Sequence, residues 1–377
     1  MRKIFGRGAR SRTLASVTAA VAVLALSVGG SRVAMAGSTY DPACFSPWSK
    51  TTPVMHFPAK KPPYRIALAN GYVGNSWRLQ MVESLRAYAK QPQVAKYIKE
   101  LKIVSVGNDV TAQLASIENF INQGYDAILV EAVSTSGYDR VIREAKRAGV
   151  ILLPFDALIN SDKVPMINED QVQLGQLWAN WIVKQMGKKG KVLEIRGIEG
   201  TSVDRDIHDG VVSVLKHYPN IKTIDVIGKW DDGTSEKAVA NAVSVYGHFG
   251  GMIEQGGTTG AVRALLDAHH PMIPVGGEGE NGFRKQMAKY RSQGLHGLSA
   301  EQAPALSAVA LKAAIALLQG KSLPQMSRVP IPHVTYKQLK AGVNYYPSLP
   351  DNFFAETSIP SCGVHITPQE LVAHQTN

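Results

Sequence analysis

Polar and aromatic side chains recur at one kind of position in this chain, just after short apolar runs. Asn75, Trp77 and Arg78 follow the first run beyond the N-terminal region, and Asp156 follows a later one. Further residues at such positions are Arg205, Trp230, Gln255, Glu278 and Gln302. In an open parallel sheet, ligands bind beyond the carboxyl ends of the strands. If the apolar runs are strands, these nine residues belong to one candidate binding site.

The nine residues have the chemistry that a polyhydroxylated ligand requires. Amide, carboxylate and guanidinium groups bond neighbouring hydroxyls in pairs, and aromatic rings cover the apolar faces of a sugar ring. Taken singly, each residue also has a structural interpretation, as a core tryptophan, a helix-capping aspartate or half of a surface ion pair. Their common placement favours binding. Because two arginines, Arg78 and Arg205, offset Asp156 and Glu278, we expect the ligand to be neutral.

The apolar runs alternate with amphipathic stretches, as strands alternate with helices in a parallel sheet. The first series begins at Tyr64, with an expected strand at 65–69 and a helix over 76–89, and it ends with a strand at 150–154. A second series starts at Gln171, and its expected elements include strands at 191–195, 223–227, 251–254 and 272–275 and a helix over 206–217. Such runs are typical of strands covered by helices on both faces, so the fold class is α/β. Two series of similar size predict two lobes.

Residues 1–36 have the composition of a secretory signal peptide. Five basic residues and no acid lie in the first thirteen positions, an apolar stretch runs over 14–28, and Ala34-Met35-Ala36 is a small-residue cleavage site. We therefore expect cleavage near Ala36 and export to the periplasm. A membrane anchor is the alternative, but the apolar stretch is short for a bilayer span.

The formal net charge of +11 does not indicate a nucleic-acid partner. Six basic residues and no acid lie in the expected signal peptide, so its removal leaves +5 for the mature chain. The two cysteines, Cys44 and Cys362, lie near the two ends of that chain. In an oxidising compartment we expect them to form a disulfide, with two free thiols as the alternative.

Residues 64–335 resemble the type I periplasmic binding proteins of bacterial ABC importers, specifically the ribose-binding type. Three stretches carry the resemblance. They are 113–148, with Ile117-Glu118 and Gln123-Gly124-Tyr125-Asp126; the loop Gly200-Thr201-Ser202 with Arg205; and Gln302 and Pro304 before an alanine-rich helix to Gly320. The resemblance implies two Rossmann-like lobes joined by a multi-strand hinge. Lobe 1 would comprise 64–167 plus 303–331, and lobe 2 would comprise 168–302 plus the tail, 332–377.

The resemblance also implies roles for the candidate residues. Asn75 and Trp77 match a ligand-bonding amide and a stacking aromatic, and Trp230 matches the facing aromatic of lobe 2. The remaining matches are Asp156 as a lobe 1 carboxylate, Arg205 as the arginine that holds sugar oxygens, Gln302 as a hydroxyl-binding glutamine, and Glu278 where the family usually has aspartate. Arg78, Ala157 and the Gln255 loop depart from the family pattern, so the resemblance defines a ligand class and leaves the sugar unspecified.

The implied partners are a small neutral sugar or polyol and the membrane subunits of an ABC importer, for a monomer without a cofactor. Contact with a chemoreceptor is an alternative that the residues leave open. A nicotinamide-dependent enzyme is disfavoured: Gly277-Glu278-Gly279-Glu280-Asn281-Gly282 fits G-x-G-x-x-G, but it comes late in the chain and its glutamates would repel a pyrophosphate. Hydrolase motifs of the G-x-S-x-G and H-E-x-x-H kinds are absent from the sequence. We therefore do not expect an enzyme.

Overall fold

The computed structural model describes residues 39–72 and 74–372, so the expected signal peptide lies outside the described residues. The first lobe is built on a sheet of four parallel strands in the order β4-β3-β5-β6. These strands are β3 (Tyr64–Asn70), β4 (Ile98–Ser105), β5 (Ala127–Glu131) and β6 (Ile151–Pro154). Every residue of β5 and β6 is buried, which is why their sequences are almost entirely apolar.

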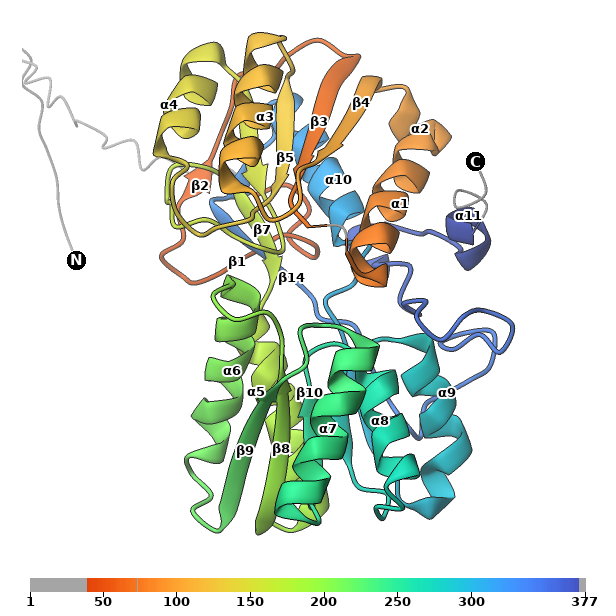
Figure 1. The fold of residues 1–377 in the computed structure, drawn as a ribbon. Helices are drawn as coiled ribbons and strands as arrows, with labels where there is room; N and C mark the ends of the chain where they lie inside the picture. Colours follow the sequence, from red (N-terminus) through yellow and green to blue (C-terminus); the bar gives the residue numbers. More distant parts are fainter. Residues whose placement is uncertain (1–38, 73, 373–377) are drawn as a thin grey trace, which may run out of the picture. The chain divides into compact units, whose positions relative to one another are not determined.

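Helices cover both faces of the first sheet (Figure 1). One face, with Leu68 and Leu129, packs against α1 (Ser76–Lys90) and α10 (Leu306–Leu318). The other face, with Ala67 and Ile128, packs against the helices α3 (Val110–Asn122) and α4 (Asp139–Ala148). Neighbouring residues of one strand thus enter opposite cores, as the alternation of side chains along a strand requires.

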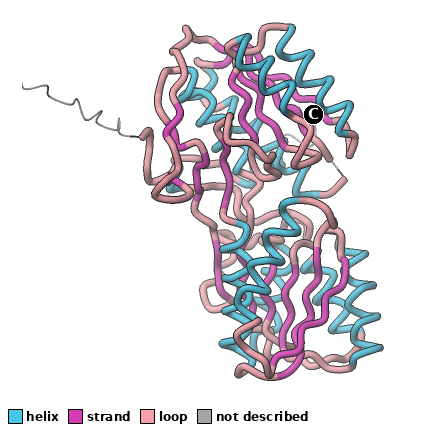
Figure 2. The backbone as a smooth tube through the Cα atoms, turned by 90° about the vertical axis from the view of Figure 1, so that its left-hand side faces the viewer, coloured by secondary structure: helices cyan, strands magenta, loops and turns pink. Residues whose placement is uncertain are grey.

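The second lobe contains six strands in the order β15-β12-β11-β10-β8-β9, with only β15 antiparallel to its neighbour. They are β8 (Gly190–Arg196), β9 (Ile221–Ile227), β10 (Gly251–Glu254), β11 (Val275–Gly277), β12 (Gly297–Ala300) and β15 (His333–Thr335). Helices again lie on both sides of the strands (Figure 2). One layer is α5 (Gln171–Met186) and α6 (Ser202–Leu215), and the other is α7 (Asp232–Tyr246), α8 (Thr258–Asp267) and α9 (Asn281–Tyr290). Within the described residues, no helix is both long and apolar enough to cross a bilayer.

Three stretches of chain near the hinge join the two lobes, and the C-terminal tail passes between them a fourth time. Two of them follow β7 (Met166–Glu169) and β14 (Met326–Val329), which pair in parallel in a small sheet with β1 (Ser46–Pro47). The third is 301–305, which connects β12 of the second lobe to α10 of the first. The predicted fold class, two α/β lobes with parallel sheets, is confirmed.

The C-terminal tail divides between the lobes, whereas the prediction placed all of 332–377 with lobe 2. Tyr336 and Leu339 pack against a core of the second lobe, but Ile359, Ile366 and Leu371 belong to the core beneath α1 and α10. The predicted Cys44–Cys362 disulfide is present, with both cysteines fully buried in that same first-lobe core. This covalent bond explains why the end of the tail lies with lobe 1.

Candidate functional site

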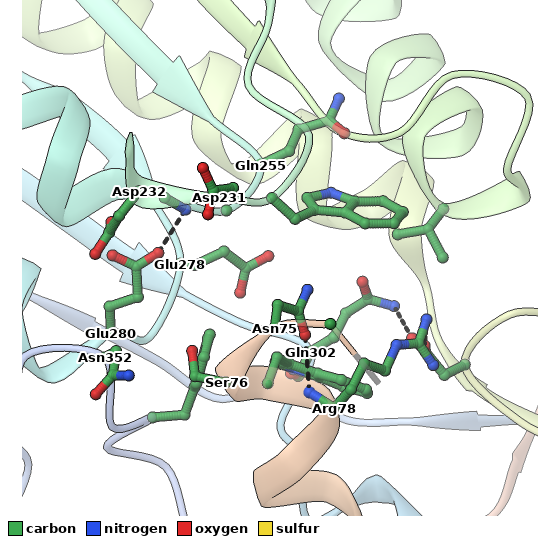
Figure 3. Close-up of a pocket in the computed structure, with 18 residues that line it drawn as sticks. Asn75, Ser76, Arg78, Asp231, Asp232, Gln255, Glu278, Glu280, Gln302 and Asn352 are labelled. Carbon is green, nitrogen blue, oxygen red and sulfur yellow. Dashed lines mark hydrogen bonds and ion pairs between the residues drawn. The ribbon is translucent and has the colours of Figure 1, made fainter. Parts of the chain in front are cut away.

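A cavity of about 300 Å³ lies where the carboxyl ends of the two sheets face each other. Figure 3 shows Asn75, Ser76 and Arg78 on one side of it and Asp231 and Gln255 opposite. Eight of the nine predicted residues line this cavity, namely Asn75, Trp77, Arg78, Asp156, Trp230, Gln255, Glu278 and Gln302. The fold therefore brings together residues more than 200 positions apart, as predicted from their placement after strands.

The first turn of α1 forms one part of the first-lobe wall. Asn75 is the N-cap of this helix, and its side-chain oxygen accepts a hydrogen bond from the backbone amide of Arg78 at 3.0 Å. The amide nitrogen of Asn75 points into the cavity (Figure 3). Trp77 packs against the first-lobe core, and its indole Nε1 donates to the carbonyl oxygen of Gln302 at 2.6 Å. Both residues are therefore held by contacts that do not need a ligand.

Arg78 is buried between two carboxylates of the first lobe. Its guanidinium forms an ion pair with Glu131 and another with Asp156, the latter at 3.3 Å. Burial raises the pKa of Glu131 to about 7 against the opposing effect of Arg78, and burial also raises the pKa of Asp156. Arg78 thus gives both buried acids of this wall a positive partner from within the protein.

Asp156 is positioned by its backbone as well as by its side chain. Its φ of 58° lies in the left-handed region, which is unusual for a residue with a side chain and is often found at functional sites. Its carbonyl oxygen accepts hydrogen bonds from the side chains of Asn168 and Gln171, at 3.1 and 3.2 Å. Gln302 donates from Nε2 to Oδ1 of Asp156 at 3.1 Å. The hinge segments therefore hold this carboxylate at the edge of the cavity.

Trp230 belongs to the second-lobe wall, in the turn between β9 and α7. Lys229 and Trp230 both have left-handed backbone conformations, with φ values of 59° and 57°. Gly197 lies against the indole, where a Cβ atom would collide with it. Asp231 follows as the N-cap of α7, and its carboxylate accepts from the backbone and hydroxyl of Thr234 at 2.8 and 2.7 Å. The strained turn is thus closed by a cap that keeps the tryptophan at the cavity.

Gln255 lines the cavity, but its amide is engaged within the second lobe. Its Oε1 accepts from the backbone amide of Gly197 at 3.1 Å, and its Nε2 donates to the carbonyl oxygen of Asp204 at 3.4 Å. The side chain is only 3% exposed. Its main contact partners are therefore the loops on either side of it, which it ties to the end of β10.

Glu280 and Glu278 follow β11 and have very different surroundings. Glu280 accepts four hydrogen bonds at the start of α8, from the backbone amides of Gly257, Thr258 and Thr259 and from the Thr259 hydroxyl. A carboxylate at a helix N-terminus complements its exposed amides and its dipole. Glu278 has one carboxylate oxygen, Oε2, that is buried without a hydrogen-bond partner. Glu280 therefore supports the structure, whereas Glu278 presents an unsatisfied group to the cavity.

Arg205 does not line the cavity, contrary to the role that the family resemblance implied. The prediction began the helix at 206, but α6 begins at Ser202, with Thr201 as its N-cap accepting from the amide of Asp204. Successive helical residues differ by about 100°, so Arg205 faces away from Val203, which does line the cavity. Its half-exposed guanidinium pairs with Asp206 at 2.8 Å. The T-x-x-D pattern of a capping box was the sequence signal for this earlier start.

The placement of Arg205 removes the charge balance on which a neutral ligand was expected. The cavity lining includes five carboxylates but, among the described residues, the single arginine Arg78. The acidic members are Asp156, Asp231, Asp232, Glu278 and Glu280. Arg78 is already shared between Asp156 and Glu131, so the second-lobe wall carries its carboxylates without a cation on the lining.

Several lining residues were not among the nine predicted ones. Glu131 does not line the cavity but pairs with Arg78, and it is the last residue of β5, so a search at the ends of strands would have found it. Asn352 and Phe354 line the cavity from the tail, and both backbone groups of Phe354 bond the side chain of Gln80 on α1. No local pattern marks the tail residues, because long-range packing brings them to the site.

Within the described residues, no cluster of three or more histidine, cysteine or acidic side chains is arranged to hold a metal.

Two α/β lobes with a polar cavity between the ends of their sheets define the architecture of a solute-binding protein. The chain belongs to the periplasmic binding protein domain family, whose model matches residues 66–322. The tail that supplies Asn352 and Phe354 lies beyond that match.

Individual proteins similar to this chain are also named as binding proteins. The chain is 25% identical over 268 residues to the xylitol-binding protein of Mycolicibacterium smegmatis, covering 70% of this chain and 75% of that protein. It is 22% identical to the ribose import binding protein of Bacillus subtilis, covering 74% of this chain and 89% of that protein. The crystal structure of an ABC transporter solute binding protein from Thermobispora bispora is similar with a TM-score of 0.64 and 29% identity, over 72% of this chain and 84% of that one.

Proposed function

We propose that the protein binds a small sugar or polyol in the cavity between its lobes and delivers it to the membrane subunits of an ABC importer. The observation that carries this proposal is a tryptophan from each lobe at one cavity whose remaining lining is rich in amides and carboxylates. Aromatic rings match the apolar faces of a sugar ring, and the polar groups match its hydroxyls. The relatives named for xylitol and ribose support the same ligand class.

The protein binds its ligand outside the cytoplasm. It acts as an exported, periplasmic monomer that binds without catalysing a reaction and without a nucleic-acid partner. Residues 1–36 are the segment that directs export, and the family match supports that location. Ligand contacts to both lobes favour the closed arrangement, because only that arrangement allows all of them at once.

A thermal-shift screen of the chain from Gly37 tests the ligand class. A sugar or polyol that binds the folded state alone raises the melting temperature by mass action, equivalent to about 2.7 kcal/mol at a concentration 100 times its Kd. Amino acids and phosphorylated compounds serve as the comparison set. Stabilisation confined to that comparison set would contradict the proposal.

The hinge is tested separately by small-angle X-ray scattering with the ligand that the screen identifies. We expect a smaller radius of gyration at saturation, because closure brings the lobes together around the ligand. Asp156→Ala is a matched variant, since it removes a carboxylate bonded to the hinge residue Gln302. An unchanged radius in the saturated wild-type protein counts against closure.

A further inference from the structure

Glu278 is the buried acid of the cavity that the fold leaves without a complete set of partners. It directly follows β11, and it is 5% exposed. Its backbone amide is held by the Thr258 hydroxyl at 3.1 Å, whereas its side-chain oxygen Oε2 has no hydrogen-bond partner. Figure 3 shows its carboxylate extending into the space between the two walls. The side chain is thus placed to meet a ligand.

The charged groups that act electrostatically on Glu278 are all acidic. Burial raises the pKa of Glu278 well above its ordinary value, and further increases come from Glu301 after β12, Glu280 after β11, Glu254 on β10 and Glu169 on β7. A buried carboxylate in such surroundings is costly unless it is protonated or meets a positive charge. The surroundings therefore favour a positive group in contact with Glu278.

The buried arginines near the cavity are engaged elsewhere. Arg78 is paired with Glu131 and Asp156. Arg284 is fully buried, bonds Ser299 at 2.9 Å and pairs with Glu301 and Glu356 at 3.6 and 3.3 Å. Neither guanidinium is paired with Glu278, so a positive group in contact with this carboxylate would be one that the ligand supplies.

The aromatic lining is suited to the same kind of ligand. An indole attracts a cation to its face more strongly than other aromatic rings do. Trp77 and Trp230 both line the cavity that Glu278 enters. Asp231 and Asp232 add two further carboxylates on the second-lobe side, although each already accepts a hydrogen bond within the protein. Together these residues form an aromatic, acid-rich site around a space of polyol size.

We propose that the ligand is an amine-bearing sugar or polyol whose ammonium group binds the carboxylate of Glu278. This inference rests on the proposed function and specifies its ligand further. Binding proceeds with loss of the Glu278 proton: the carboxylic acid and the ammonium ion give a carboxylate–ammonium pair and a proton released to solvent. A neutral sugar leaves the acid protonated and releases none.

Matched pairs of probes test this proposal on the chain from Gly37. The pairs are D-glucosamine and D-glucose, D-galactosamine and D-galactose, and 1-amino-1-deoxy-D-glucitol and D-glucitol. Thermal shift ranks all six, and titration calorimetry in two buffers of different ionisation enthalpy counts the protons released. We expect at least one amine to bind roughly 10- to 150-fold more tightly than its neutral parent, the range for a hydrogen bond to a charged group, with proton release.

Three variants assign the effect to Glu278. Glu278→Gln keeps the shape and removes the charge, so the preference for the amine should fall to within about threefold of its parent. Glu278→Asp keeps the charge and should retain most of the preference. Glu236→Gln removes an acid that pairs with Arg263 on the surface, and serves as the matched control. Because amine and parent are compared within one variant, partial loss of folded protein does not alter the ratio.

The outcomes separate this inference from the proposed function. A neutral parent that binds as well as its amine, or an amine preference that persists in Glu278→Gln, overturns the inference and leaves sugar binding intact. Failure of all six compounds, together with all other sugars and polyols of the screen, overturns both.

Discussion

The two walls of the cavity carry their charges in different ways. On the first-lobe wall, Arg78 lies between Glu131 and Asp156 and forms an ion pair with each of these acids. On the second-lobe wall, Glu280 is satisfied by amides at a helix start, while Glu278 keeps an oxygen without a partner. The first wall is complete before any ligand arrives. The second is incomplete, and so it is the wall that can select a ligand by charge.

The buried acids of the two walls also differ in their effect on stability. A buried ion pair contributes little over an apolar replacement, but loss of one partner leaves a buried charge uncompensated. Glu278 is in the opposite situation, since its removal takes away a cost. The same kind of side chain, a buried glutamate, therefore has a charged partner within the protein on one wall and lacks one on the other.

The largest expected effect comes from Arg78→Met. Removal of the guanidinium leaves Glu131 and Asp156 without their positive partner in the first lobe. We therefore expect the free energy of unfolding to fall by about 3–5 kcal/mol. Urea denaturation of the ligand-free protein, followed by circular dichroism, measures it. Glu278→Gln is the matched variant on the other wall and should be within about 1 kcal/mol of wild type or more stable. Equal losses of unfolding free energy in the two variants would contradict the proposed difference between the walls.

Stability should also depend on pH with a defined sign. Burial raises the pKa of Glu280 to about 7 and that of Glu301 to about 8. In the unfolded chain, glutamates ionise near their ordinary pKa of about 4.3. Between about pH 5 and 8 the folded state thus binds more protons, and stability falls as pH rises, by up to about 1.4 kcal/mol per pH unit for each such group.

Urea unfolding at several pH values across that window measures the slope. Glu301→Gln should flatten the slope at the upper end, because of the two glutamates it removes the one with the higher pKa. A stability that does not fall with rising pH over this range would contradict the raised pKa of these buried acids.

The two tryptophans distinguish the walls by a smaller effect on affinity. Trp77→Ala and Trp230→Ala should each weaken binding of the identified ligand by about 1–3 kcal/mol, through lost stacking and apolar contact. Both tryptophans pack against a core of their own lobe, and Trp77 also bonds Gln302, so Trp77→Ala should lower the melting temperature further than Trp230→Ala does. Calorimetry and thermal unfolding of both variants provide the comparison, and Trp77→Phe, which keeps a ring, is the control. A larger melting loss for Trp230→Ala would reverse the assignment.

The sequence was sufficient to predict where the site forms. Parallel strands end at one edge, so residues that follow apolar runs had to meet there, and eight of the nine residues line the cavity. The disulfide was predictable because only two cysteines occur in a chain expected to be exported. These inferences depend on local pattern and topology alone.

The charge of the site was not predictable in the same way. It depends on which arginine enters the cavity, and a shift of four residues in the start of α6 turned Arg205 outward. It also depends on hydrogen bonds between distant segments, such as those that satisfy Glu280 but not Glu278. Asn352 comes from the tail, whose position follows from packing against both lobes.

The smallest expected effect is that of Arg205→Ala, and it tests the acidity of the second wall most directly. The guanidinium is half-exposed, lies outside the cavity and pairs with its neighbour Asp206. Exposed pairs of this kind contribute little, so affinity for the identified ligand should change by less than about 0.5 kcal/mol, or about twofold. Calorimetry measures the change, with Arg263→Ala on α8 as a control that removes another partly exposed, ion-paired arginine. If Arg205→Ala instead weakened binding tenfold or more while the control did not, the closed protein would turn this arginine inward. Its charge would then offset Glu278, and the difference between the two walls would vanish on closure.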